Sequence, residues 1–169
     1  MLWQKLMASQ TASALETDLV WTVATSAANE TFTIPCRDIG VFDATVEWGD
    51  GSASAITAYN DADLAHTYAS AGDHQIRISG TFPNIYFNNA GDKLKVKSVE
   101  NLGVMGWENT ERAFFGCSNM VSFVAGNTDT SSVTNMSNMF HTCSSLTSID
   151  ASGFDTSSAT NMSGMFCTC

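Results

Sequence analysis

The sequence predicts a mostly β chain made of a small β-sandwich followed by a short solenoid of 26-residue repeats. Residues 19–82 contain several short alternating segments separated by turns, which is typical of a sandwich. Downstream, Phe114, Phe140 and Phe166 recur 26 positions apart, which indicates stacked repeats. Only 14% of the residues are charged, and serine, threonine, asparagine and glycine supply most of the polarity, which favours β structure rich in turns.

The first segment, residues 1–18, is predicted to be an N-terminal helix or anchor. Apolar residues recur at helical spacing over residues 2–16, among them Trp3 and Leu6. An isolated helix of this length is marginal in water, so we expect it either to dock on the sandwich or to anchor the chain to a partner. The segment has no unbroken apolar stretch that would suit a signal peptide or a membrane span.

Alternating apolar residues predict the strands of the sandwich over residues 19–82. Residues 27–30 and residues 49–51 supply turns between them, because asparagine and glycine accept a positive φ. The side chains expected to face inward are Leu19, Trp21, Val23, Phe32, Ile34, Val46, Trp48, Ile76 and Ile78.

Two short motifs occur in this part of the chain, a W-G-D-G turn and a later H-x-Y-x-x-x-G segment. Their residues are Trp48, Gly49, Asp50, Gly51, His66, Tyr68 and Gly72. In this order and separation they resemble the hallmark of PKD-type immunoglobulin-like domains, which places such a domain at residues 19–82. The resemblance implies a structural role for these residues, with a structural hydrogen bond as the simplest role of His66.

The repeat is the strongest pattern in the chain. Residues 114–139 and residues 140–165 share 14 identities in 26 positions, and the segments DTSSVTNMSNMF and DTSSATNMSGMF are nearly identical. These segments resemble the repeats of BspA-like leucine-rich repeat surface proteins, and the resemblance covers roughly residues 20–169. It implies a connector and N-terminal cap of the solenoid at residues 83–112, followed by BspA-like repeats at residues 113–169, the third of them incomplete.

One repeat cannot bury its own apolar side, so successive repeats are expected to stack and to share a core. Residues 146–150 are predicted to form a short strand beside residues 120–124, at about 4.8 Å. Asn135 and Asn161 are expected to form an internal side-chain ladder to backbone groups. The other residues expected to stack at equivalent repeat positions include Cys117, Cys143, Cys169, Met139, Met165, Phe140 and Phe166.

Charge and metal-ligand patterns narrow the possible functions. Lysine and arginine number 7 against 17 aspartate and glutamate residues, a net charge of -10, which excludes a basic surface for nucleic acid. The five cysteines form no CxxC pair, which argues against a zinc site and against a closed disulfide framework. Asp50, Asp61 and Asp63 are weak calcium candidates, but no EF-hand spacing occurs, so a solvated acidic rim is the simpler interpretation.

These observations predict a non-catalytic protein without a cofactor, which binds through the extended face of its repeats. The BspA-like resemblance implies an extracellular or cell-surface location and adhesion to a protein or glycan on a cell or matrix surface. The alternative is a virion component, such as a capsid decoration or tail fibre protein on the virion surface. A self-assembling extracellular filament is also consistent with the sequence. In either alternative the partners are neighbouring subunits of a homo-oligomer.

The third repeat stops at residues 166–169 without the polar cap that repeat arrays need. We therefore expect either that the natural protein continues or that another subunit covers the open end.

Overall fold

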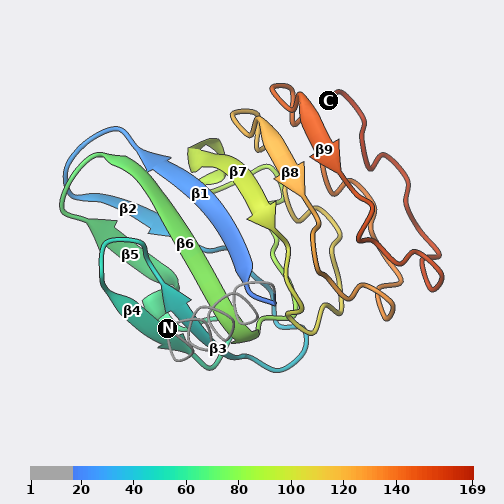
Figure 1. Cartoon of the computed structure of the whole chain (residues 1–169), viewed down its shortest axis with the longest axis horizontal. Coiled ribbons are helices and arrows are strands. Elements are labelled where there is room, and N and C mark those ends of the chain that lie inside the picture. The colour runs from blue at the N-terminus through green and yellow to red at the C-terminus, as the bar shows by residue number, and fades with distance from the viewer. Residues whose placement is uncertain (1–16) are drawn as a thin grey trace, which may run out of the picture.

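The computed structural model describes residues 17–169, which contain nine β-strands. Seven strands form one mixed sheet and the other two form a smaller sheet (Figure 1). No α-helix occurs among these residues, and two short 3-10 helices, η1 (Ala62–Leu64) and η2 (Lys93–Lys95), lie between strands. The prediction of a mostly β chain is therefore confirmed. The helix predicted at residues 2–16 lies outside the described residues.

The first half of the large sheet is antiparallel. Its strands, in spatial order, are β4 (Ala53–Ile56), β3 (Asp43–Glu47), β6 (Gly72–Thr81) and β1 (Leu19–Thr25). The smaller sheet pairs β2 (Glu30–Thr33) with β5 (Ala65–Tyr68). It packs against the large sheet where Phe32 meets the ring of Trp21 edge-on, with centroids 5.6 Å apart. All nine side chains expected to face inward are buried, so the alternation that predicts them is confirmed.

The large sheet continues from β1 into the second half of the chain (Figure 1). There β1 pairs antiparallel with β7 (Val96–Asn101), and β8 (Ser122–Val124) and β9 (Ser148–Asp150) follow in parallel. The predicted pairing of residues 146–150 with residues 120–124 is confirmed. Both strands are shorter than expected, because the backbone just before each of them is folded into turns.

Successive repeats are also joined by a second ladder of backbone hydrogen bonds, away from the strands. The N–H of Phe114 donates to the carbonyl oxygen of Met139 at 2.9 Å, and the N–H of Phe140 donates to that of Met165 at 2.9 Å. Equivalent bonds join Arg112 with Ser137, Gly116 with His141, Asn138 with Ser163 and Thr142 with Cys167. Each bond donated by residues 112–116 recurs 26 residues later, at residues 138–142. Successive repeats are therefore joined by the same backbone contacts.

One continuous core runs from β1 to the third repeat. The rings of Phe114 and Phe140 stack with centroids 5.9 Å apart, and Phe166 extends the stack at 5.4 Å. Trp21 of β1 contacts Phe114 at 6.4 Å, so the two halves of the chain share this core. The domain boundary predicted at residue 82 is thus crossed by both the sheet and the core.

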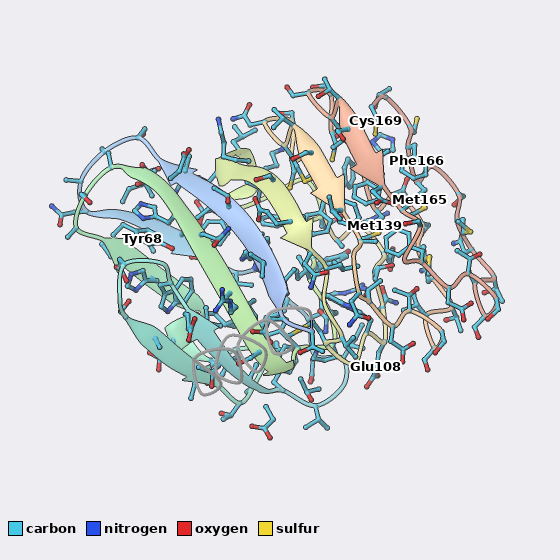
Figure 2. The ribbon with its side chains drawn as sticks, viewed as in Figure 1. Tyr68, Glu108, Met139, Met165, Phe166 and Cys169 are labelled. Carbon is cyan, nitrogen blue, oxygen red and sulfur yellow. The ribbon has the colours of Figure 1, made fainter. Side chains whose placement is uncertain are left out.

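The third repeat has no neighbour on its outer side. Figure 2 shows Met139 on the second repeat and Met165 and Phe166, which are consecutive in sequence, at the outer end of the stack. Met139 and Met165 are buried, whereas Phe166 is 49% exposed, because only the next repeat would cover its outer face. Within residues 17–169, no helix has the length and apolar character needed to cross a membrane.

Candidate functional site

The W-G-D-G turn connects β3 to β4. Gly49 has a φ of +85°, and a Cβ at this position would lie 2.5 Å from the carbonyl oxygen of Gln75, so the turn requires glycine. The Asp50 carboxylate accepts hydrogen bonds from the backbone N–H of Ser52 at 3.0 Å and from its hydroxyl at 2.5 Å. It also lies 2.8 Å from Nε2 of His66, the partner that links the turn to β5. The Ser52 and His66 contacts hold the pKa of Asp50 far below its usual value.

A stack of rings extends this contact into the core. Trp48 and His66 lie nearly parallel with centroids 4.8 Å apart, and Tyr68 meets His66 edge-on at 4.7 Å. Tyr68 in turn stacks on His74, whose Nε2 lies 3.0 Å from the hydroxyl of Thr25. The Tyr68 hydroxyl donates to the carbonyl oxygen of Trp48 at 2.9 Å, and burial raises the pKa of this phenol, so that it remains a neutral donor. The motif residues therefore contact one another and hold β3, β5 and β6 together.

The three calcium candidates do not form a shared site. The Asp61 carboxylate accepts hydrogen bonds from the backbone N–H groups of Thr57 and Asp63, which caps η1. Asp50 is engaged by Ser52 and His66. Within the described part of the chain, no three histidine, cysteine, aspartate or glutamate side chains gather as metal ligands. The carboxylates of Asp50 and Asp61 are thus each engaged within their own loop.

The repeat asparagines close turns within their own repeat. Oδ1 of Asn135 accepts hydrogen bonds from the backbone N–H of Ser137 at 3.0 Å and from its hydroxyl at 2.7 Å. Asn161 and Ser163 repeat the arrangement at 3.1 and 2.8 Å. The link from one repeat to the next is a backbone bridge between Asn135 and Asn161. The expected ladder is thus formed by the backbone, because the side chains are used locally.

Sequence reasoning missed the same turn at three aspartates. Asp129 and Asp155 each accept a hydrogen bond from the backbone N–H of the serine two residues later, and Asp150 does so with Ser152. The spacing D-x-S, repeated beside N-x-S, was the available signal. These carboxylates keep depressed pKa values because the serine groups bind their charged form.

The repeat cysteines are packing residues. The thiol of Cys143 donates to the carbonyl oxygen of Phe114 at 3.2 Å, and that of Cys169 donates to Phe140 at 2.8 Å. Burial raises the pKa of Cys143 to about 12, and it also raises the pKa of the buried Cys117. Neutral thiols are poor nucleophiles and poor metal ligands, so Cys117 and Cys143 contribute to the core by packing.

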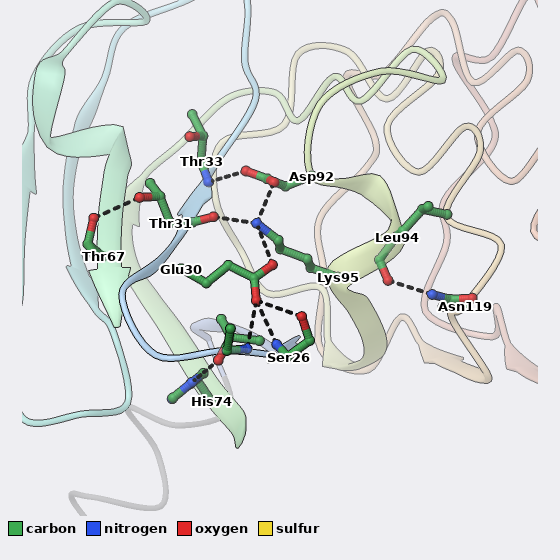
Figure 3. A network of polar contacts seen from close by, with 12 residues as sticks. Ser26, Glu30, Thr31, Thr33, Thr67, His74, Asp92, Leu94, Lys95 and Asn119 are labelled. Carbon is green, nitrogen blue, oxygen red and sulfur yellow. Dashed lines mark hydrogen bonds and ion pairs between the residues drawn. The ribbon is translucent and has the colours of Figure 1, made fainter. Parts of the chain in front are cut away.

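A charged network fixes the start of β7 against β2 (Figure 3). The ammonium of Lys95 lies 2.7 Å from the Asp92 carboxylate and 3.2 Å from that of Glu30. Asp92 also accepts a hydrogen bond from the backbone N–H of Thr33 at 2.8 Å. Burial opposes the charge of Lys95, but its contacts with Asp92 and Glu30 outweigh this and raise its pKa. Hydrogen bonds from the backbone of Ser26 and from Lys95 lower the pKa of Glu30 to about 2.

The solvent-facing side of the three parallel strands carries a regular row of hydroxyl groups. Ser98, Ser122 and Ser148 lie in register on β7, β8 and β9. Thr22 of β1 continues the row, because it pairs with Ser98. We call the solvent-facing side chains of β7, β8 and β9 the repeat face. It is an open surface on which the same position recurs once in each strand.

A groove of about 370 Å³ opens at the corner of the repeats that precedes β8 and β9. We call it the corner groove, and it is lined by Asn89, Lys93, Gly116, Ser118, Thr142, Ser144 and Thr168. Sequence reasoning missed it. The one available signal was a cluster of three lysines at residues 93–97 in an acidic chain.

The fold and these surfaces define a class of protein, namely a mostly β chain whose second half is a stack of repeats joined by backbone ladders. Residues 81–169, just over half of the 169 residues, match the family described as Mycoplasma protein of unknown function, DUF285, and the chain belongs to this family. No curated protein and no solved structure matched the chain.

Proposed function

We propose that the protein is a non-catalytic, surface-displayed module that adheres to a protein or glycan through its repeats. The observation that supports this function is the ordered repetition of the same side-chain positions along the repeat face and its corners. A surface of this kind offers many weak contacts to an extended ligand, whereas an enzyme needs a few converging groups in an enclosed site.

We also propose the finer fold assignment. The W-G-D-G turn, closed by Asp50 and His66 over a buried tyrosine, supports a PKD-type sandwich at residues 19–82. The backbone ladders with a 26-residue period support a leucine-rich-type solenoid of BspA-like repeats at residues 113–169. The family match over residues 81–169 covers the proposed connector and repeats.

The experiment that tests adhesion displays the full chain on a non-adherent bacterium and measures retention on surfaces coated with matrix proteins or glycans. We expect retention above that of cells without the protein. Ser122→Arg on the repeat face should reduce it, because the new side chain projects into the contact surface. Ser132→Arg, at an exposed position outside the strands, is the matched control. Absence of retention on every coating would refute adhesion.

A second candidate function, a filament or virion subunit, is favoured by the outer side of the third repeat. Ile149, Met162 and Phe166 are 42%, 43% and 49% exposed there. Their equivalents one repeat earlier, Phe123, Met136 and Phe140, are fully buried. The edge of β9 is also free for pairing among the described residues. A second copy of the chain would cover both features, as would a further repeat after residue 169.

Light scattering and electron microscopy of the purified chain test this second candidate. Ordered oligomers that dissociate in Phe166→Glu would support contact between copies through the third repeat. Val41→Glu, which changes a residue that is 74% exposed in the first half, is the matched control. A monomer at all concentrations would leave adhesion as the function.

A further inference from the structure

We infer that the corner groove binds a short saccharide that carries a carboxylate, with Lys93 as the group that receives the negative charge. The inference rests on the proposed adhesive function and names the class of ligand for it. It depends on three features of the groove: a cation without an ion-pair partner, a row of hydroxyl groups, and backbone N–H groups that are already hydrogen-bonded in the first two repeats.

The cation is held in place but not neutralised. The Lys93 ammonium donates to the carbonyl oxygen of Asn89 at 2.9 Å and also contacts its side-chain oxygen. No carboxylate within residues 17–169 lies close enough to form an ion pair with it, in contrast to Lys95. In a chain with a net charge of -10, this leaves a preorganised site for one anionic group.

The first repeat is adapted to this lysine. Gly116 has a φ of +84°, and a Cβ at this position would lie 2.9 Å from Cδ of Lys93 and 2.3 Å from Oδ1 of Asn89, so glycine leaves room for the lysine in its present position. The equivalent residues of the next two repeats are Thr142 and Thr168, each with a φ of +59°. A β-branched residue in this region of φ is uncommon, and both threonines line the groove.

The hydroxyl groups offer both donors and acceptors. Thr142 and Thr168 donate to the carbonyl oxygens of the residues before them, at 2.7 and 2.6 Å, which leaves their oxygen lone pairs to accept. The hydroxyls of Ser118 and Ser144 have no hydrogen-bond partner among the described residues. A row of mixed donors and acceptors, repeated along the stack, matches the hydroxyl groups of a saccharide.

Around the first two repeats, the backbone of the groove offers few free N–H groups to an extended peptide. The N–H groups of Gly116 and Thr142 are used by the next repeat, and the N–H of Ser118 donates to the carbonyl oxygen of Gly116 at 2.7 Å. A peptide that binds by strand addition needs free backbone groups along an edge. The groove instead presents side chains, and one lysine suits one carboxylate better than a polyanion, which the overall negative charge repels.

Isothermal titration of the full chain with the hyaluronan disaccharide, which carries one carboxylate, tests the inference. We expect saturable binding that Lys93→Gln weakens about tenfold or more, because a charge-assisted hydrogen bond is lost. Lys97→Gln, which removes an equal charge outside the groove, should leave the affinity unchanged. Ser144→Ala should weaken binding several-fold, while Ser145→Ala, next to it but outside the groove lining, should not.

Three results would overturn the inference. Equal binding of the neutral disaccharide N,N′-diacetylchitobiose would remove the role of the charge, and equal binding of acetate or of a tetrapeptide of glutamate would remove the role of the sugar. Equal losses in Lys97→Gln and Lys93→Gln would reduce it to general electrostatic attraction. If cells were retained but the purified chain bound no saccharide, the inferred saccharide site would be refuted and the proposed adhesion would remain supported. If the chain bound the saccharide but cells were not retained, the saccharide site would be supported and adhesion refuted.

Discussion

Three hydrogen-bond contacts, two from Ser52 and one from His66, keep the Asp50 carboxylate charged in the folded protein. Its folded-state pKa therefore lies below the value of 3.8 expected for the unfolded chain. A group with a depressed pKa contributes stability that is present above its unfolded pKa and is lost as the pH falls through its folded pKa. Asp50 therefore makes the stability of the fold depend on pH in the acid range.

We predict that Asp50→Asn lowers the free energy of unfolding at neutral pH, and that the difference from the natural protein shrinks below a pH of 3.8. Urea denaturation at a series of pH values measures it. The control is Asp73→Asn, since Asp73 is exposed and its carboxylate accepts no hydrogen bond from any residue in the range 17–169. Parallel pH profiles for the two variants would contradict the assignment of Asp50 as the residue whose hydrogen bonds stabilise the turn.

The thiols provide a second prediction at this scale. Cys117 and Cys143 are buried with raised pKa values, whereas Cys167 is exposed. Iodoacetamide at about pH 8 should modify Cys167 in the native protein and leave the other two unmodified, because only an accessible thiolate reacts. Mass spectrometry after digestion measures this, and all three should react in urea. Modification of Cys143 at the rate of Cys167 would contradict its place in the core.

At the scale of elements, each repeat is completed by the next. Phe140 is fully buried because the third repeat covers it, whereas the equivalent Phe166 is 49% exposed. Covering one aromatic ring contributes about 1.5–3 kcal/mol. The stack therefore gains stability from each neighbour, and a repeat at the end of the stack contributes less than one inside it.

We predict that Phe140→Ala lowers the free energy of unfolding by about 3–5 kcal/mol, because it leaves a cavity in the shared core. Phe166→Ala should cost less than half as much, since its ring is already half in water. Urea denaturation of the two variants measures the difference, and each variant is the control of the other. Equal losses would show that something else covers Phe166 in solution.

The elements that the sequence predicts best are those with local patterns. Alternation places Trp21, Val46 and Ile78 in the core, and the 26-residue period places Phe140 on Phe114. The W-G-D-G turn is recognisable because glycine is required by its backbone. These features depend on neighbours in sequence or on an exact copy one repeat away.

The features that the sequence does not predict depend on distant pairings. The contact of Trp21 with Val99 joins two strands that are separated by most of the first half of the chain. The corner groove combines Asn89 and Lys93 with three different repeats, so no single motif contains it. Asn135 and Asn161 were expected to link repeats, but each side chain instead accepts a hydrogen bond from the backbone N–H of the serine two residues later.

For the whole molecule, the continuity of sheet and core across β1 and β7 is the feature with the largest consequence. Val99 is 1% exposed at this junction and lies in the same core as Trp48 and Phe140. Two parts that share a sheet and a core have a large interface of buried apolar area, and loss of one part uncovers the other. We therefore expect residues 17–169 to unfold in one cooperative transition.

The prediction is that Val99→Ala lowers stability by about 1–3 kcal/mol in both halves at once. Hydrogen exchange followed by mass spectrometry measures it, because peptides from β3 and β6 report on the first half and peptides from residues 135–143 report on the repeats. The control, Val41→Ala, changes an exposed side chain and should alter neither half by more than about 0.5 kcal/mol. If only the repeats lost protection in Val99→Ala, the two halves would unfold independently. The core that they share would then not make their unfolding cooperative.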